Sequence, residues 1–447
     1  MPEPLDERLN EAVEVTKTAE RARILSHYDG DGTAAAALLT LALLREGMEV
    51  HTTLSHQLEP EELEALDLDS ADVLLVSDMG SAQVDFLEKF KLPVVILDHH
   101  QPLRESKSVI QINPHLFGLS GTKDLCGATT AWLFTLAMAE ANLDLAGIAL
   151  IGCIADRQHV GGFEGINKAL FGKAVEENVL KPERALALAD LSMEEALLYS
   201  VGPYFKDLSG RKNRVQKFLS DMHLDAGTRF RELRDAEKEN LVSTLSLWLL
   251  RQGVRPETVE HLVEERYWYP PYGIYVDELE AYVNACSRHG EESLGLSLSL
   301  GDFSERERAE EIRTKHWKEV LKGLMKVEAD GVFSKKHVQF FYTDVATLAG
   351  SVAGVSMRYL LDQEKPTLAL VVADGMTKVS ARATDYLIEK GLNLAEALKL
   401  GAEAAGGSGG GHNIASGATI SKGKEERFLD TVDSVVGKQL TGGSPEA

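Results

Sequence analysis

The sequence predicts an α/β protein with a parallel-sheet domain, a helical middle region and a second, smaller α/β domain. Over the first 180 residues, short β-rich segments alternate with helical stretches, which is typical of a parallel sheet covered by helices. Three of these segments end in carboxylates or imidazoles. Because ligands of such sheets bind beyond the C-terminal ends of the strands, these endings predict a functional site.

Strands and helices can be placed in order along this first part. Apolar and β-branched runs predict strands at 23–27, 48–54, 72–77, 93–98 and 109–112. Apolar residues at helical spacing predict helices at 5–20, 33–46, 60–66, 82–89, 126–142 and 145–155.

The remainder of the chain changes character twice. Leucines at helical spacing, such as Leu241, Leu245 and Leu249, predict a mostly helical middle region. Its aromatic, proline-containing segment 267–273 is interpreted either as a corner between helices or as a stacking surface for bases. Strands are then predicted at 338–342, 367–372 and 377–382, with a helix at 428–436. We therefore predict domains at 1–182, 183–330 and 331–440, and a disordered tail at 441–447.

Composition narrows the class of protein. A length of 447 residues predicts two or three domains, and no apolar run is long enough to cross a membrane. The formal net charge of −23 argues against nucleic-acid binding through bulk charge, so any such binding must be local. Cys126, Cys153 and Cys286 have no metal-ligand spacing and are interpreted as buried thiols of a cytoplasmic protein.

The first strand ending, His27-Tyr28-Asp29-Gly30-Asp31-Gly32, carries two carboxylates and one imidazole. If the strand ends near Ser26, then His27, Asp29 and Asp31 share one side at a period of two. The glycines permit a tight turn into the following helix. The alternative is a simple strand-to-helix turn with Asp as its N-cap, although a cap needs only one Asp.

Three further groups belong to the same pattern. Asp78 follows the strand at 72–77 and could alternatively be a helix cap. Asp98-His99-His100 ends the strand at 93–98, where adjacent imidazoles rarely serve packing. Asp156 ends an apolar helix and is weak evidence alone. Together, mixed carboxylate and imidazole ligands favour Mn²⁺, with Mg²⁺, Co²⁺ or Fe²⁺ possible. The ligands suffice for two metals roughly 3.5–4 Å apart that share a carboxylate, an arrangement suited to phosphoester hydrolysis.

The glycine-rich segment 406–411, which ends at His412, suggests a second site. Glycines let backbone amides approach an anion closely, Arg382 can bind a phosphate bidentately, and Ser380 adds a hydroxyl donor. The alternative for the glycines is a flexible linker. The basic cluster 211–217 is interpreted as a solvated helix face or as a patch that guides a nucleic-acid strand.

These motifs resemble, in order, those of the DHH phosphoesterase superfamily. The first four resemble its catalytic-domain motifs, and Ser380-Ala381-Arg382 and Gly406–His412 resemble the Ser-x-Arg strand and glycine-rich segment of the DHH-associated substrate domain. The length and the helical middle resemble most the archaeal RecJ-like nucleases.

The resemblance implies a role for each residue. Asp78 would bridge two metals, with His27 and Asp29 on one ion and Asp31, His99 and Asp156 on the other. Asp98 would orient an imidazole from behind the metals, and His100 would face the scissile phosphate as an acid or a charge stabiliser. Substrate would be bound by Ser380, Arg382, Gly409, Gly410, Gly411 and His412.

The expected function is a two-metal exonuclease that degrades single-stranded DNA or RNA to mononucleotides in replication or repair, with Mn²⁺ or Mg²⁺. One alternative is a small-nucleotide phosphoesterase acting on nanoRNA, phosphoadenosine phosphate or a cyclic dinucleotide. Another is a replisome scaffold that binds GINS, although intact carboxylates at Asp29, Asp31, Asp78 and Asp156 argue against a dead site. Polarity and sugar preference stay open.

Overall fold

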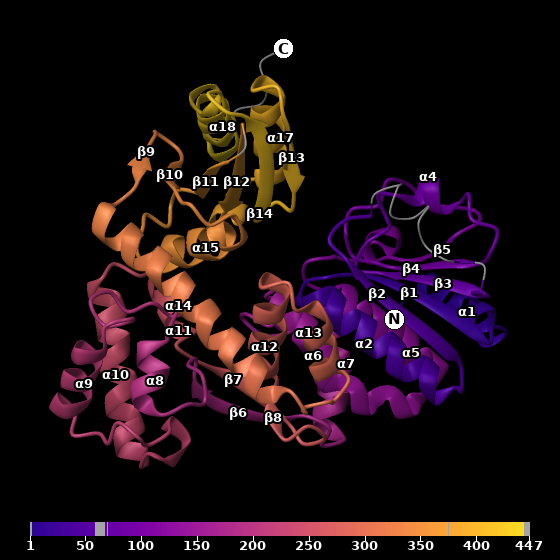
Figure 1. Ribbon diagram of the computed structural model, residues 1–447, viewed down its shortest axis with the longest axis horizontal. Coiled ribbons are helices and arrows are strands. Elements are labelled where there is room, and N and C mark those ends of the chain that lie inside the picture. The colour runs from indigo at the N-terminus through magenta and orange to yellow at the C-terminus, as the bar shows by residue number, and fades with distance from the viewer. Residues whose placement is uncertain (1, 59–67, 69, 374, 442–447) are drawn as a thin grey trace. The chain divides into compact units, whose positions relative to one another are not determined.

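The computed structural model describes residues 2–58, 68, 70–373 and 375–441, and they form two compact units (Figure 1). The first unit contains 1–184 and 265–313, and the second contains 185–264 and 314–447. The middle region predicted at 183–330 thus contributes to both units, and the predicted domain boundaries stay a prediction. The helix predicted at 60–66 lies outside the described residues, as does the tail beyond Thr441.

The first unit is built on a five-stranded sheet of order β2-β1-β3-β4-β5, in which every neighbouring pair is parallel. Its strands are β1 Arg21–His27, β2 Glu49–Ser55, β3 Val73–Ser77, β4 Val94–Leu97 and β5 Ile110–Ile112, as predicted. β3 and β4 are buried along their whole length, which explains their unbroken apolar sequences. The register pairs Ser26 with Ser77 and Ser77 with Leu97, so the strands end at one common edge.

The helices of the first unit pack on this sheet or on one another. They are α1 Glu3–Lys17, α2 Gly30–Arg45, α4 Val84–Leu87, α5 Gly127–Met138, α6 Ala146–Ala155, α7 Gly165–Glu176, α12 Val276–Arg288 and α13 Glu292–Ser299. α2 is buried almost all round, and its alanines 34–37 allow close packing against α5 and α6. The helix predicted at 126–142 ends at Met138, where a 3₁₀ segment, Glu140–Leu145, leads into α6.

The aromatic segment 267–273 is not a corner between helices. It forms the end of β7 Val263–Tyr269 and a turn into β8 Ile274–Tyr275, and β6 Lys181–Leu186 completes this small sheet. The ring of Tyr269 is buried over Gly147, where a Cβ would lie 2.4 Å from it. Tyr269 therefore serves the core of the first unit and not a base-stacking surface.

The second unit contains a helical part and a sheet. The helices of the first part are α8 Met193–Leu198, α9 Lys212–Asp221, α10 Asp235–Arg251 and α11 Pro256–Glu260, and α14 Arg306–Asp330 enters the unit at residue 314. Leu241, Leu245 and Leu249 form the buried face of α10, as their spacing predicts. The basic cluster 211–217 is paired with acids, because Lys212 lies 3.3 Å from Glu194 and Arg211 lies 2.9 Å from Glu328. These ion pairs favour the solvated-face interpretation.

The sheet of the second unit has the order β13-β14-β12-β11-β10-β9. Its strands are β9 Phe333–Ser334, β10 Gln339–Tyr342, β11 Thr367–Ala373, β12 Met376–Arg382, β13 Ser408–Gly411 and β14 Ala415–Ser421, and its helices are α15 Ala349–Tyr359, α16 Asp385–Glu389, α17 Leu394–Ala404 and α18 Glu425–Leu440. Val379 and Ala381 of β12 pack into the core with α17 and α18, whereas Ala369 and Val371 of β11 pack with α15. The glycine-rich segment is thus an ordered strand and not a linker.

In the part of the chain that the structure describes, no helix is both long enough and apolar enough to span a bilayer.

Candidate metal centre

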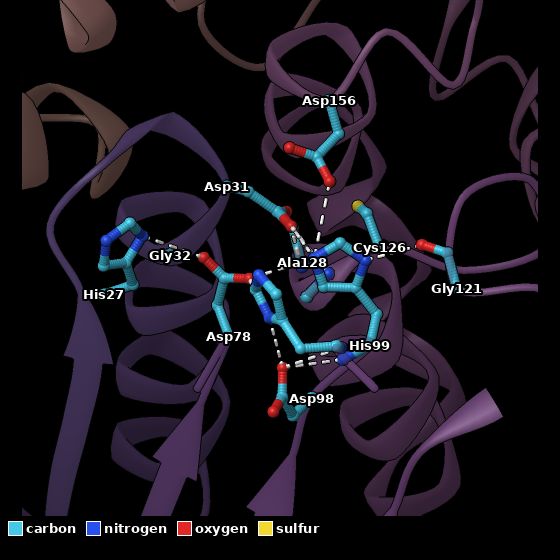
Figure 2. A network of polar contacts seen from close by, with 12 residues as sticks. His27, Asp31, Gly32, Asp78, Asp98, His99, Gly121, Cys126, Ala128 and Asp156 are labelled. Carbon is cyan, nitrogen blue, oxygen red and sulfur yellow. Dashed lines mark hydrogen bonds and ion pairs between the residues drawn. The ribbon is translucent and has the colours of Figure 1, made fainter. Parts of the chain in front are cut away.

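The residues predicted to bind metal converge at the C-terminal edge of the first sheet (Figure 2). β1 ends at His27, Asp78 follows β3, and His99 lies two residues after the end of β4. Asp156 directly follows the last residue of α6. Because the parallel register aligns the ends of β1, β3 and β4, residues distant in sequence become neighbours.

The turn after β1 differs from the predicted extended segment. α2 already begins at Gly30, so Asp31 lies in its first turn and does not share a strand face with His27 and Asp29. Asp29 is the N-cap of α2, and its side chain accepts a hydrogen bond of 3.2 Å from the Gly32 amide. It also lies 3.1 Å from Nδ1 of His27. Asp29 therefore caps the helix and also lies in the candidate site, so the two interpretations of this residue do not exclude each other.

Asp78 occupies the centre of the site. Its Oδ2 lies 3.5 Å from His27 Nδ1, and its Oδ1 lies 3.3 Å from His99 Nε2. The residue is buried, has a left-handed φ of 54°, and its Oδ1 has no hydrogen-bond partner among the described residues. A strained backbone and a buried acceptor without a donor are costly, and a cation at this position would offset both.

Asp31 is fixed from behind by a helix N-terminus. Its two carboxylate oxygens accept hydrogen bonds of 2.7 Å from the Gly127 and Ala128 amides, at the start of α5. A Cβ at Gly152 would lie 2.1 Å from Asp31 Oδ1, and one at Gly127 would lie 2.6 Å from the Asp78 side chain. Both positions therefore require glycine because a side chain would clash with a carboxylate. The sequence alone does not predict this requirement.

His99 presents one nitrogen to the carboxylates. Its Nδ1 lies 2.6 Å from the Gly121 carbonyl and so donates to it, which leaves Nε2 as the potential ligand. Nε2 lies 3.7 Å from Asp31, 3.3 Å from Asp78 and 3.4 Å from Asp156. A neutral imidazole held in this tautomer is suited to a metal.

Asp98 lies behind this arrangement. One oxygen accepts from the Ser81 amide at 3.0 Å, and the other accepts from the His99 amide and from His100 Nδ1, both at 2.8 Å. With its acceptors used in this way, Asp98 orients the two histidines. His100 keeps part of its ring at the surface, with 40% of its side chain exposed.

Three groups among the described residues could each hold a metal ion: His27, Asp29 and Asp78; Asp31, His99 and Asp156; and Asp78, His99 and His100. Asp78 contributes a different oxygen to each neighbouring histidine, as a bridging carboxylate would. Oxygen and imidazole donors fit Mn²⁺ or Mg²⁺. Cys126 and Cys153 are buried, with sulfurs 3.9 Å apart, and burial raises the pKa of both thiols. They belong to none of these groups.

The electrostatics of the site favour cations. Burial, together with the nearby charges of Asp78 and Asp156, raises the pKa of Asp31 well above its ordinary value. Burial likewise raises the pKa of Asp156 to about 6, against the opposing effect of His99. Burial lowers the pKa of His27, but Asp29 and Asp78 outweigh it and raise that pKa to about 11. The raised pKa values let Asp31 and Asp156 hold protons that metal ions would replace. Asp78 differs, because burial raises its pKa but the neighbouring His27 and His99 outweigh burial and lower it.

The predicted substrate-binding residues all lie in the second unit. Ser380 and Arg382 are on β12, and the register aligns Ser380, Gly417 and Gly410 in one row across β12, β14 and β13. A Cβ at Gly409 would lie 2.8 Å from the Leu398 carbonyl, and Gly411 has a φ of 134°. A Cβ at Gly410 would meet nothing within 4 Å. Gly409 and Gly411 are therefore required by the fold, whereas Gly410 is not.

Sequence reasoning missed Gly417. The glycine lies beside Ser380 only because β14 pairs with β12, and no local pattern predicts that register. Asn413 to Ala415 returns the chain from His412 into β14, where the His412 amide donates to the Ala415 carbonyl at 2.9 Å.

Comparison with known families agrees with this architecture. A model of the DHH family, N-terminal domain, matches residues 21–153, and a model of the DHHA1 domain matches residues 337–438. The chain belongs to the DHH superfamily, whose members are phosphoesterases, and it is related to the RecJ exonucleases.

Two curated proteins illustrate the relationship. An uncharacterized protein from Methanocaldococcus jannaschii is 28% identical over 97% of this chain and 99% of its own length. The single-stranded-DNA-specific exonuclease RecJ of Thermus thermophilus is 31% identical over 35% of this chain, but only 25% of the length of RecJ is covered.

Two solved structures share the fold. RecJ from Thermus thermophilus in complex with Mn²⁺ superposes with a TM-score of 0.61 at 19% identity, over 98% of this chain and 55% of RecJ. CDC45 from Entamoeba histolytica superposes with a TM-score of 0.64 at 11% identity, over 97% of both chains.

Proposed function

We propose that this protein is a divalent-metal-dependent phosphodiesterase that removes mononucleotides from the end of single-stranded DNA or RNA. The observation that carries the proposal is the position of Asp78. It belongs to the ligand group of His27 and Asp29, and its other oxygen lies 3.3 Å from Nε2 of His99, a member of the group with Asp31 and Asp156. A carboxylate between two metals would occupy such a position. The relationship to RecJ supports a nucleic-acid substrate.

The residues divide the work as follows. Metal ions bound by the two groups would activate a water molecule and stabilise charge on the phosphate. Asp98 holds His100 through Nδ1, and 40% of the His100 side chain is exposed. We assign His100 to the scissile phosphate, where a protonated ring would donate to a phosphate oxygen or to the leaving group. Burial lowers the pKa of His100, but Asp98 outweighs it and raises that pKa, which supports this role.

The second unit is proposed to hold the nucleotide. The guanidinium of Arg382 and the hydroxyl of Ser380 are donors for a phosphate. The backbone at Gly410 is free of side-chain cover and would admit a ligand, with Gly409, Gly411 and His412 shaping the strand around it. The row of Ser380, Gly417 and Gly410 is the specific support for this assignment.

A non-enzymatic replisome scaffold that binds GINS is the second candidate, and the shared fold of CDC45 is the observation that favours it. The binding of GINS alone does not require a dead site, because an active nuclease can also dock on a replication protein. A pull-down with purified GINS tests this partner directly.

The enzymatic proposal is tested with single-stranded DNA and RNA, each labelled at either end, incubated with Mn²⁺ or Mg²⁺. We expect the wild-type protein to release mononucleotides, and Asp78→Asn to lose at least about 100-fold in rate because the carboxylate charge between His27 and His99 is lost. Comparing a dinucleotide with a 20-nucleotide substrate separates an exonuclease from a small-nucleotide phosphoesterase. Full activity of Asp78→Asn would contradict the proposal.

A further inference from the structure

The side chain of Arg382 packs against helix α15, in the space that a side chain at Gly350 would occupy. Gly350 and Gly354 lie one turn apart on this helix. A Cβ on Gly350 would lie 2.4 Å from Nη2 of Arg382 and 3.1 Å from its Cζ. Alanine at 350 could therefore not coexist with the present position of the guanidinium.

Neither the backbone nor the core explains the glycine at 350. Its φ is not left-handed, and glycine is a poorer helix former than alanine. The three atoms nearest to a Cβ at this position all belong to Arg382. Gly354 differs, because a Cβ there would lie 3.6 Å from Arg382 Cγ, an ordinary contact. The space left at Gly350 is thus specific to the charged end of Arg382.

We propose that Gly350 is a positioning residue for the phosphate-binding function of Arg382, an inference that rests on the function proposed above. Bidentate binding of a phosphate depends on the orientation of the guanidinium fork. The gap at Gly350 and the hydrogen bond of 2.9 Å from Nη1 of Arg382 to the Ala381 carbonyl both contribute to that orientation. A methyl group at 350 would displace the fork from this position.

The test is equilibrium binding of a short fluorescein-labelled oligothymidylate to the full chain, measured by anisotropy in EDTA so that no hydrolysis occurs. Arg382→Ala is expected to raise Kd about 10- to 100-fold, the usual effect of losing a hydrogen-bonded charge. Gly350→Ala is expected to raise Kd by a similar factor without lowering Tm. Gly354→Ala is the matched control and is expected to bind like the wild type.

A double variant separates positioning from a general structural effect. If Gly350 acts only through Arg382, Gly350→Ala combined with Arg382→Ala binds no worse than Arg382→Ala alone. Additive losses, or wild-type binding by Gly350→Ala while Arg382→Ala is impaired, would overturn the inference and leave the proposed function intact. Wild-type binding by Arg382→Ala would instead overturn both the proposed role of Arg382 and the inference.

Discussion

At the scale of single residues, Gln158 lies between two members of one candidate metal-binding group, His99 and Asp156. Its Nε2 donates to the Gly121 carbonyl at 3.1 Å, and that carbonyl also accepts from His99 Nδ1 at 2.6 Å. Its Oε1 accepts from the buried Asn167 at 2.8 Å. Gln158 lies two residues after Asp156, so one amide fixes the loop beside His99 relative to the turn that carries Asp156. Partners of this kind hold a metal ligand in its tautomer and orientation.

We predict that Gln158→Leu weakens Mn²⁺ binding about 10- to 100-fold, as loss of such a partner usually does. Isothermal titration of the metal-free protein with Mn²⁺ measures this without reference to catalysis. Gln339→Leu is the control, because Gln339 is an equally buried amide that donates to backbone carbonyls in the second unit. Equal Mn²⁺ affinities for the two variants would contradict the prediction.

The sequence indicated which residues lie together at this edge of the sheet because each one interrupts a local pattern, and their binding of metal stays a prediction. Asp78 and Asp98 stand out at the ends of apolar strands, where a polar residue needs a reason. The supporting residues interrupt no pattern. Gly127 and Gly152 lie within or at the start of apolar helices, and only their approach to Asp78 and Asp31 explains them. Contacts between residues about 50 to 120 positions apart are set by packing, which one sequence does not display.

At the scale of elements, β13 is a strand that could not be predicted from its amino-acid composition. Ser408–Gly411 has almost no side chains and lacks the β-branched residues that predict strands. Its partner β14 supplies the register, and α17 packs against the face that contains Gly409. Similarly, the helical pattern of the middle region favours a corner between helices at 267–273, whereas the antiparallel pairing of Trp268 with Tyr275 makes this segment part of a hairpin.

Gly410 allows the ligand role of β13 to be tested apart from its fold. We predict that Gly410→Val keeps or raises Tm, because the space above it is open and valine favours strands, but weakens oligonucleotide binding by blocking the exposed backbone. Gly409→Val should instead lower Tm, since its side chain would meet the Leu398 carbonyl. Thermal melts and anisotropy on both variants measure this. Unchanged binding by Gly410→Val would exclude a ligand at this backbone.

At the scale of the whole molecule, each of the two units is built from two separate segments of the chain. Residues 265–313 return to the first unit after 185–264 have entered the second. A change in composition along the sequence could mark the helical middle, but it could not show that this region is shared. Which unit a helix joins depends on long-range apolar contacts, such as those of Tyr282 and Val283 with the core of the first sheet's domain.

The protein is strongly acidic, with a formal net charge of −23, and part of this charge lies in the candidate metal centre. The stability of the whole molecule should therefore depend on pH and on bound cations. Acidic groups concentrated in a buried site oppose folding unless protons or cations neutralise them. In the metal-free protein the raised pKa values of Asp31 and Asp156 mean that each stabilises the fold while protonated. That stability is complete below the ordinary pKa of about 3.8 and is lost as pH rises through the folded value, about 6 for Asp156.

We therefore predict that Mn²⁺ stabilises this protein more at about pH 8 than at about pH 5.5, because metal ions and protons compete for the same carboxylates. At a Mn²⁺ concentration of 100 times Kd the gain in free energy of unfolding is about 2.7 kcal/mol, which differential scanning fluorimetry resolves as a rise in Tm. Asp78→Asn should show a smaller rise at both pH values, since two of the three candidate ligand groups contain the Asp78 carboxylate. EDTA should reverse the effect. A Tm shift that is equal at the two pH values would mean that Mn²⁺ binds elsewhere than at these carboxylates.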